Sequence, residues 1–581
     1  MTTPASPAFV PIPLNAARWE EIEPLLLALR DRPVRTPADL EQWLLDRSEL
    51  EAACQEAESD LYISMTCHTD DAEAAGAFTR YIETIPPRLK PAIFALDRRQ
   101  VDLFKQFKPD PRRFEVIDRD TRAEVELFRP ENVPIQTELE KLSQEYQTIS
   151  GAMMVTFDGR EQTLPMMARY QESPERAIRE SAWRAVAERR FRDADAIETL
   201  FDRMIALRDQ MARQAGLPTF VEYAFKSRRR FDYTPDQCRI FHDAVAKAVV
   251  PFVRRQNDRR KRQLRCGTLR PWDLAVDPKG RPPLKPFTGG VELMAKSVRT
   301  FERLDPRLAA MLATLGDGAN TNGAAEGACL DLDTRKGKAP GGYQAMRDRS
   351  RKPFIFMNAA GLHRDVETMV HEAGHAFHSL LCLDEPLLHY RHAPLEFCEV
   401  ASMSMELLTM PHWKATDGFY PAQTDADRAR RKQVEGSVSL LPWIATIDAF
   451  QHWLYANPTH SRDERAEAWL AIDDRFGPDV SWTGLEANRR TLWHRQGHLF
   501  AVPFYYIEYG IAQLGALQLW LRSLEDGPKA AIESYMAALR LGGSRPIPEL
   551  FAAAGIKFDF GAEIVGRLVE RVERELDKLP E

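Results

Sequence analysis

The chain has 581 residues and a formal net charge of -7, with 44% hydrophobic and 28% charged residues. This composition is that of a soluble globular protein, and the length exceeds one ordinary core, so we expect two to four lobes or one large helical body. The mildly acidic balance excludes a general attraction to nucleic acid or to anionic membranes.

The N-terminus and the cysteines indicate the cellular location of the protein. MTTPASPAFVPIPLN lacks the basic start and apolar run of a secretory signal. No apolar stretch reaches the about 18–20 residues that span a bilayer. The seven cysteines are scattered, odd in number and without a CxxC pair, which is typical of reduced thiols in a cytoplasmic protein. A cysteine zinc ribbon is therefore not expected, and any metal would be held by histidine and carboxylate side chains.

The first half of the chain predicts mainly helix. Across Pro174–Ala215 no internal glycine or proline interrupts apolar residues at helical spacing, and Ser173 and Gly216 are suitable start and stop signals. The basic run Arg254–Arg265 is interpreted as the solvated face of a helix. Arg270–Gly290 contains five prolines and three glycines and predicts an irregular connection.

Strand signals are few and lie in the second half. Leu330–Thr334 and Pro353–Asn358 are short and apolar and predict a small sheet, with the glycine-rich loop KGKAPGGYQAMRDRSRK between them. Glu563–Lys578 again has helical periodicity. A coarse division gives an N-terminal helical region at 1–190 and a larger catalytic body at 191–581. The boundary is soft, because the helix predicted across Pro174–Ala215 can itself join the two regions.

The candidate site lies in VETMVHEAGHAFHSLL, which predicts a helix from a cap at Asp365 to Leu381. His371 and His375 are one turn apart, about 40° around the axis, so both imidazoles can reach one ion. Glu372 lies about 100° from His371, where a carboxylate can take the proton from a zinc-activated water. The alternative is a buried amphipathic helix whose histidines have ordinary partners, because an HExxH pattern also arises by chance.

A third histidine, His378, follows the motif. It lies about 10.5 Å further along the helix axis than His371, and one tetrahedral ion cannot easily take three ligands from a straight helix. The metzincin pattern requires glycine at position 378 and histidine at position 381, so Leu381 and His378 exclude that class. We expect His378 to pack or to support the site from outside.

The third ligand is expected from HAPLEFCEVASMSMELL, which predicts a second helix after Pro394. Glu396, Glu399 and Glu406 have spacings of three and seven and therefore favour one helix face. Acids on so apolar a helix need partners, which a metal and its histidines would supply. Glu399 is the predicted ligand, and Glu406 is the predicted acceptor for the ring N–H of a ligating histidine.

These motifs resemble the oligoendopeptidase F branch of the thimet oligopeptidase family of zinc metallopeptidases. PGGYQAMRDRSRKPFIFMN resembles the family's Gly-Gly-Tyr loop and the strand after it, and RQGHLFAVPFYYIEYGIAQLGALQLW resembles its downstream His/Tyr segment. DGREQTLPMMARYQESPERAIRESAWRA resembles the N-terminal region of bacterial oligoendopeptidases. The resemblance covers residues 140–560 in patches and is weak before residue 130.

The resemblance implies a mainly α fold, a large helical bowl or clamshell around a deep substrate channel, with a small β-sheet near the zinc-binding helix. Such a channel would admit unfolded oligopeptides and exclude folded proteins. It also implies one Zn²⁺ per chain, held by His371, His375 and Glu399, with Glu372 as the general base.

The resemblance also implies that the downstream His/Tyr segment binds the substrate and the tetrahedral oxyanion. The matching positions are His498, Tyr505 and Tyr509, and a tyrosine hydroxyl aimed at the oxyanion would stabilise the transition state. Because the spacing differs from the thimet-like pattern, Tyr506 is an alternative for either tyrosine. The backbone at Gly341, Gly342 and Tyr343 is expected to bind the peptide as an added strand.

The sequence therefore predicts a zinc-dependent endopeptidase that hydrolyses short unfolded oligopeptides. The two alternatives are a zinc hydrolase of a non-peptide amide and a catalytically silent helical binding protein. The intact ligand and base positions argue against the second alternative. Oligopeptides are the expected partners, with no nucleic acid and no membrane, and the sequence does not distinguish a monomer from a homo-oligomer.

Overall fold

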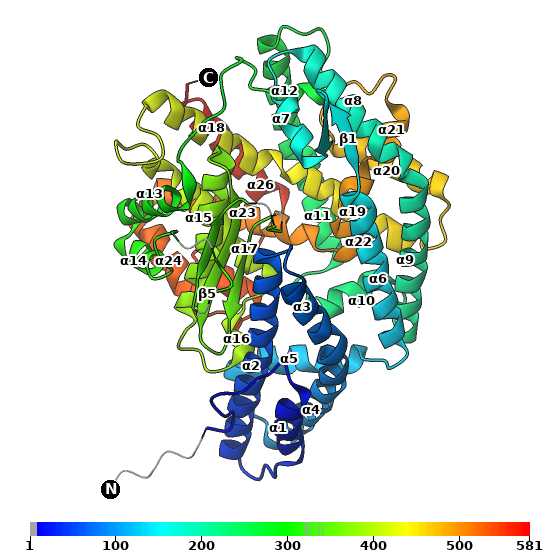
Figure 1. Cartoon of the computed structure of the whole chain (residues 1–581), viewed down its shortest axis with the longest axis vertical. Helices are drawn as coiled ribbons and strands as arrows, with labels where there is room; N and C mark the ends of the chain where they lie inside the picture. Colours follow the sequence, from blue (N-terminus) through cyan, green and yellow to red (C-terminus); the bar gives the residue numbers. More distant parts are fainter. Residues whose placement is uncertain (1–7, 320–321, 326, 336, 340, 581) are drawn as a thin grey trace.

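The chain folds into two groups of helices that meet beside a small β-sheet (Figure 1). The computed structural model describes residues 8–319, 322–325, 327–335, 337–339 and 341–580. The predicted lack of an export signal falls partly on residues 1–7, which lie outside the described residues. The mainly α fold with a small sheet next to the HEAGH helix is confirmed.

The N-terminal group, blue in Figure 1, consists of five helices with a core of their own. Thr36 and Asp39 accept hydrogen bonds from each other's backbone N–H and so fix the start of the second helix. Trp43 is fully buried and donates its indole N–H to the carbonyl of Leu29. The helices are α1 (Trp19–Asp31), α2 (Pro37–Cys67), α3 (Ala72–Thr84), α4 (Pro86–Phe107) and α5 (Pro111–Leu127).

The second group contains the larger core, which extends from Leu127 to Leu576. Its first part runs through α6 (Asn132–Gly151), β1 (Met154–Phe157), β2 (Arg160–Thr163), a 3-10 turn η1 (Pro165–Met167), α7 (Ala168–Gln171), α8 (Arg176–Arg192), α9 (Ala194–Gln214), α10 (Phe220–Ser227), α11 (Pro235–Ala244), a π-helical turn η2 (Val245–Val249), α12 (Val250–Gln263), η3 (Pro271–Asp273), α13 (Gly289–Leu304) and α14 (Pro306–Ala313).

After the three-stranded sheet the second group is again helical. It comprises α15 (His363–Leu381), α16 (Leu388–Arg391), α17 (Leu395–Leu408), η4 (Met410–His412), α18 (Gln423–Ser439), α19 (Leu441–Ala456), α20 (Arg462–Phe476), α21 (Glu486–Arg490), η5 (Leu492–Arg495), α22 (His498–Ala501), α23 (Tyr506–Glu525), α24 (Pro528–Leu539), α25 (Ile547–Ala553) and α26 (Ala562–Leu576). The helix predicted at Glu563–Lys578 is α26. The division of the chain near residue 190 stays a prediction.

The sheet of the second group has the order β3-β5-β4, with β3 (Leu330–Asp333), β4 (Tyr343–Arg347) and β5 (Lys352–Ala359). The two predicted strands, β3 and β5, pair in parallel with Leu330 opposite Ile355. The expected loop between them is wrong in part, because its second half forms β4, antiparallel to β5. Within the described residues, the outer edge of β4 has no partner strand.

Two further differences from the sequence prediction lie before the sheet. The helix predicted across Pro174–Ala215 breaks at Asp193, whose ψ of 5° leaves helical geometry between α8 and α9. The hairpin β1–β2 was not predicted. Its two-residue turn is Asp158-Gly159, with both φ angles positive, as a tight hairpin turn requires.

A cavity of about 910 Å³ lies where the N-terminal helices face α17 and α23. The segment between α15 and α17 also reaches the N-terminal group: Leu387 and Tyr390 are buried in its core. The Tyr390 hydroxyl donates to the carbonyl of Arg113 at 2.6 Å, and its own carbonyl accepts from the N–H of Gly543 at 2.9 Å. None of the helices in the described part of the chain is long and apolar enough to cross a membrane.

Candidate metal centre

Helix α15 directly follows β5 and carries the HEAGH motif. Asp365 was expected to cap it, but the helix begins at His363, and the Asp365 carboxylate lies in the first turn. There it accepts the backbone N–H groups of Ala360 and Leu362 at 2.8 and 2.9 Å. The carboxylate fixes the turn between strand and helix, and its negative charge suits the positive end of the helix dipole. Opposite the histidines, α15 buries an apolar face of Val366, Met369, Val370, Ala373, Ala376 and Phe377.

The close approach of α15 to α17 depends on Gly374. A Cβ atom at this position would lie 2.6 Å from the carbonyl oxygen of Ala401 and 2.6 Å from the Cα of Ser402. Both contacts are with the backbone of α17, which cannot rotate away as a side chain can. The glycine of HEAGH is therefore what lets α17 carry Glu399 up to the histidines of α15.

Three of the predicted ligands meet at one point. The Nε2 atoms of His371 and His375 lie 3.4 and 3.8 Å from Oε2 of Glu399. All three donor atoms lie within 4.8 Å of one another. In a tetrahedral zinc site with bonds of about 2.0–2.2 Å, donor atoms are about 3.4 Å apart. Two imidazoles and one carboxylate are also the donor set of a catalytic zinc site with an open position, so these residues fit a zinc ion.

The charges around this point favour a cation. Burial would raise the pKa of Glu399, but its hydrogen bond to His371 and the nearby His375 lower it to about 2. Burial lowers the pKa of His375 to about 4, so its imidazole is neutral at pH 7. Burial would also lower the pKa of His371, yet the carboxylates of Glu399 and Glu406 raise it well above its usual value. A positive charge is thus stabilised between these groups, and a divalent ion would supply it.

Glu406 orients His371 from the side away from Glu399. Its Oε1 lies 2.7 Å from Nδ1 of His371, and its Oε2 accepts from the side-chain amide of Gln433 at 2.8 Å. With Nδ1 as the donor to Glu406, Nε2 of His371 is the nitrogen that would bind an ion, in place of the hydrogen that it shares with Glu399. Glu399 itself accepts from the Ser402 hydroxyl at 3.0 Å. This is the arrangement expected around metal-bound histidines.

Glu372 lies beside these groups and has a different environment. It is 6% exposed, and burial raises its pKa to about 7, with His371 opposing and Glu399 and Glu406 adding to the shift. A Cβ built on Gly342 would lie 3.8 Å from its Oε1. The open edge of β4 therefore begins next to a carboxyl group that can hold or release a proton near neutral pH.

The two remaining polar candidates, His378 on α15 and Glu396 on α17, do not join the group of His371, His375 and Glu399. His378 is buried against Phe397, its Nε2 has no hydrogen-bond partner, and burial lowers its pKa to about 3. The neutral ring packs, as expected from the helix geometry. Glu396 does not join the ligand group: its Oε1 accepts from the Tyr233 hydroxyl at 2.7 Å and lies 3.8 Å from Nε of Arg230.

The loop residue Tyr343 uses its side chain to hold the edge strand. Its ring stacks on Phe356 with centroids 4.8 Å apart, and its hydroxyl forms a 2.6 Å hydrogen bond with Thr66 of α2. The side chain is thus occupied within the fold. The part of Gly341–Tyr343 that remains for a ligand is the backbone.

The His/Tyr segment forms one aromatic cluster. The His498 ring lies 5.8 Å from Tyr505, 4.9 Å from Tyr506 and 6.1 Å from Tyr509. Burial raises the pKa of Tyr505 and of Tyr509, and the charge of Glu399 adds to both shifts. The corresponding neighbours of Tyr506 are Gln496, Trp443 and Arg495. The charge of Glu399 thus acts on Tyr505 and Tyr509, and we expect these two tyrosines, rather than Tyr506, to reach the candidate metal centre.

A strained turn leads into α23 and its tyrosines. Phe504 has a φ of 65°, which a non-glycine residue adopts only when its surroundings enforce it. Its N–H donates to the Gln451 side chain, its carbonyl accepts from Arg230, and the carbonyl of Pro503 accepts from Arg228 at 2.9 Å. These buried groups fix the direction in which the tyrosines enter the site.

The contacts of Arg228 and Arg230 with this turn were not predicted from the sequence. The two arginines lie in YAFKSRRRFDY, 274 and 275 residues before the carbonyls that they bind. Three consecutive arginines beside aromatic residues could have indicated buried arginines, but no nearby residue indicates which carbonyl groups they bind.

The chain is similar to known proteins over most of its length. The profile of Peptidase family M3 matches residues 169–568. An oligoendopeptidase F homologue of Borreliella burgdorferi is 24% identical over 234 residues, and the oligopeptidase PepF of Bacillus subtilis is 22% identical over 291 residues. These alignments cover 39% and 48% of this chain and 38% and 42% of the relatives. The matched part thus spans less than half of the length of either relative.

Solved structures resemble the whole chain. An X-ray structure of a protein classed as an oligoendopeptidase F has a TM-score of 0.87 and 27% identity, with 99% of each chain covered. The structure of PZ peptidase A with an inhibitor has a TM-score of 0.86 and 25% identity, covering 98% of this chain and 99% of that one.

Proposed function

Because the chain belongs to Peptidase family M3, in its oligoendopeptidase F branch, we propose that it is a zinc-dependent endopeptidase of short unfolded oligopeptides. The observation that carries the proposal is the meeting of His371, His375 and Glu399 around one point, with Glu372 beside them. When bound, a zinc ion would polarise the scissile carbonyl and make a water molecule acidic.

Residues of the chain itself transfer the proton, stabilise the oxyanion and hold the substrate. Glu372 takes the proton of the attacking water and later gives it to the leaving amine nitrogen. Its pKa of about 7 suits both directions of transfer. The raised pKa values of Tyr505 and Tyr509 keep both hydroxyls protonated, so they can donate hydrogen bonds to the oxyanion as it forms. His498, in the same aromatic cluster, helps to hold the substrate backbone.

The peptide itself is proposed to bind along the open edge of β4. The backbone of Gly341–Tyr343 would pair with it as an added strand, and Gly342 would leave room for it next to Glu372. Backbone pairing recognises extended chains rather than particular side chains, which suits oligopeptides and excludes folded proteins. The seven free cysteines support a reducing location, and we propose the cytoplasm.

Digestion of a mixed peptide library, read by mass spectrometry with and without a zinc chelator, tests the function. The intact enzyme should cleave internal bonds of short peptides, and the chelator should stop it. Cleavage of small amides but of no peptide would instead identify a non-peptide amide hydrolase. Absence of both zinc and chelator-sensitive cleavage would identify a silent binding protein.

The Glu372→Gln variant tests the mechanism. It should bind zinc like the parent protein, because Glu372 is not a ligand, but lose about 10²–10⁴-fold in kcat. The matched control is Glu467→Gln on the exposed surface of α20, which should keep full activity. Undiminished turnover by purified Glu372→Gln would rule out its role as the general base.

A further inference from the structure

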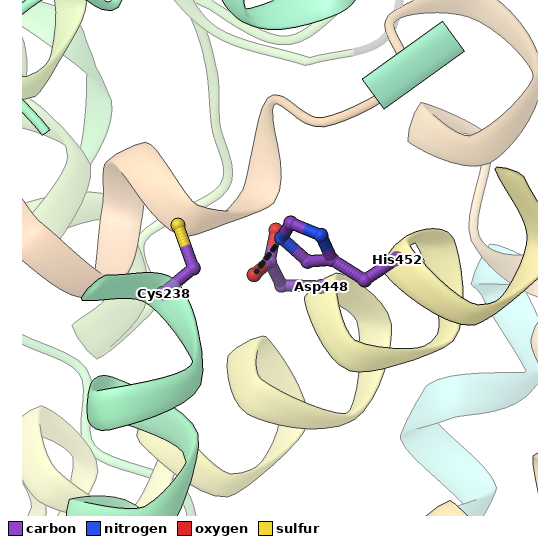
Figure 2. Close-up of side chains that lie close together, drawn as sticks. All are labelled: Cys238, Asp448 and His452. Atoms are coloured by element: carbon purple, nitrogen blue, oxygen red, sulfur yellow. Dashed lines mark ion pairs between the residues drawn. The ribbon is translucent and has the colours of Figure 1, made fainter. Parts of the chain in front are cut away.

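A second group of metal-binding side chains lies in the core, on two other helices. Cys238 and His242 are one turn apart on α11, and Asp448 and His452 are one turn apart on α19. Figure 2 shows the side chains of Cys238, Asp448 and His452, with a dashed line for the ion pair between His452 and Asp448. The i, i+4 spacing directs both residues of each pair to the same helix face, so four potential ligands meet where α11 and α19 pack.

The donor atoms are already close enough for one ion. Those of Cys238, Asp448 and His452 lie within 4.8 Å of one another, as do the three donors of the candidate catalytic centre. Nε2 of His452 is 3.4 Å from Oδ2 of Asp448. Zinc bonds of about 2.0–2.3 Å would require the donors to draw together by about 1 Å, which small side-chain rotations can supply.

Asp448 and His452 are buried and only partly hydrogen-bonded. The Asp448 side chain is fully buried, and its Oδ1 has no hydrogen-bond partner among the described residues. Within the same part of the chain, Nε2 of His452 has only the 3.4 Å ion pair with Oδ2 of Asp448. A buried carboxylate without full compensation is costly, so an unpartnered oxygen of this kind needs an explanation. The closer partner of Oδ2 is Nε2 of His242, at 2.8 Å. Both histidines therefore lie on the Oδ2 side, and Oδ1 remains for an ion, which would replace the longer contact between His452 and Oδ2.

The same residue types could form a nucleophilic cysteine site, but burial excludes this. Cys238 is 1% exposed, and the side chains of His452 and Asp448 are 10% and 0% exposed. No substrate can reach the thiol without opening the core. A site that is closed to substrate instead favours a structural role for a bound ion.

We propose that Cys238, Asp448 and His452 form a second, structural site for a divalent ion of the zinc class, with His242 orienting Asp448 from outside the ligand set. On binding, the Cys238 thiol gives its proton to solvent. A thiolate, a carboxylate and a neutral imidazole around a doubly charged ion make an electrically neutral unit, which the core can accommodate. Sulfur, nitrogen and oxygen donors together favour zinc over magnesium or calcium.

The site has a defined structural consequence. Gln451, next to His452, accepts the N–H of Phe504, and the Phe504 ring lies 5.2 Å from the ring of His452. An ion that joins α11 to α19 would therefore stiffen the support beneath the strained turn before Tyr505. This inference does not depend on the proposed peptidase function, and its test is independent of activity.

Zinc content and cobalt spectra of the full-length protein test the proposal. Elemental analysis should find a second equivalent of zinc per chain, and the double variant His371→Ala/His375→Ala should keep one equivalent. Replacement by Co²⁺ should produce a thiolate-to-cobalt absorption band, which the candidate catalytic centre cannot produce because it contains no cysteine. Since the band is recorded on the unmutated protein, it does not depend on any variant folding.

Variants then assign the band. Cys238→Ser should abolish it and remove one equivalent of zinc, whereas Cys54→Ser, which alters another buried thiol on α2, should change neither. A zinc content of one equivalent together with no thiolate band would overturn the proposal. A band that persists in folded Cys238→Ser would equally contradict it.

Discussion

Glu406 lies outside the proposed ligand set but contacts one of its members. Its carboxylate binds Nδ1 of His371 on one side and the amide of Gln433 on the other. The first contact leaves Nε2 as the ring nitrogen that faces Glu399 and would bind an ion, and the second holds the carboxylate in place. Sequence spacing predicted this role for Glu406 but not Gln433, because Gln433 lies on α18 and no local pattern joins it to the site.

Removal of this support should weaken metal binding without removing a ligand. We expect Glu406→Ala to lower zinc affinity by about 10–100-fold, as is typical when the partner of a ligating histidine is lost. Competition with a chelator of known affinity measures the change. Glu467→Ala on the surface of α20 serves as the control and should bind zinc like the parent. Equal zinc affinity in both variants would show that Glu406 does not orient His371.

At the scale of elements, the spacing between α15 and α17 decides whether the site forms. The HEAGH helix was recognisable from its periodicity, and so was the glutamate helix after Pro394. Their mutual distance was not, because it depends on the missing side chain at Gly374 and on the backbone opposite it. The site residues could thus be named from the sequence, whereas the contact that brings them together needed coordinates.

Gly374→Ala should separate these two helices. Its Cβ would lie 2.6 Å from backbone atoms of α17, so we expect a loss of about 1–3 kcal/mol in the free energy of unfolding, together with weaker zinc binding. Gly566→Ala is the matched control on α26, where nothing lies within 4 Å of the new Cβ. That change should stabilise the protein by about 0.4–1 kcal/mol. Urea denaturation compares the two, and equal effects would refute the packing argument.

The elements that sequence reasoning missed share a physical cause. β4 follows two glycines and includes Gln344, Ala345 and the charged Arg347, so its strand character comes from pairing with β5 rather than from its own composition. The hairpin β1–β2 did have a local signal, the Asp158-Gly159 turn, which was not used. The arginine contacts of the Phe504 turn and the contacts within the Cys238 cluster join residues more than 200 positions apart, beyond any local pattern.

For the molecule as a whole, buried ion pairs between distant segments make stability dependent on pH. Asp273 is fully buried and binds Arg176 and Arg179 of α8. Burial would raise the pKa of Asp273, but the hydrogen bonds of the two arginines outweigh it and lower the pKa. The folded value lies below the unfolded value of about 3.9. This pair therefore stabilises the fold above about pH 4, and the contribution is lost as pH falls through the folded pKa.

Asp273→Asn should accordingly destabilise the protein most at neutral pH. We expect a loss of about 3–5 kcal/mol at pH 7, because buried Arg179 loses its counter-charge, and a smaller difference from the parent below about pH 4. Denaturation midpoints at both pH values measure this. Asp463→Asn is the control: its pair with Arg490 is exposed, and the change should stay within about 0.5 kcal/mol. A loss that is independent of pH would contradict the assignment.

Leu387 and Tyr390 are buried in the N-terminal core and so connect the N-terminal helices to the candidate metal centre. These residues belong to the segment that links α15, which carries both histidines, to α17, which carries Glu399. The N-terminal helices also contact the sheet beside Glu372, through the hydrogen bond between Thr66 and Tyr343. We therefore expect a displacement of the N-terminal helices to move groups on both sides of the candidate metal centre, although these helices lie more than 200 residues earlier in the chain.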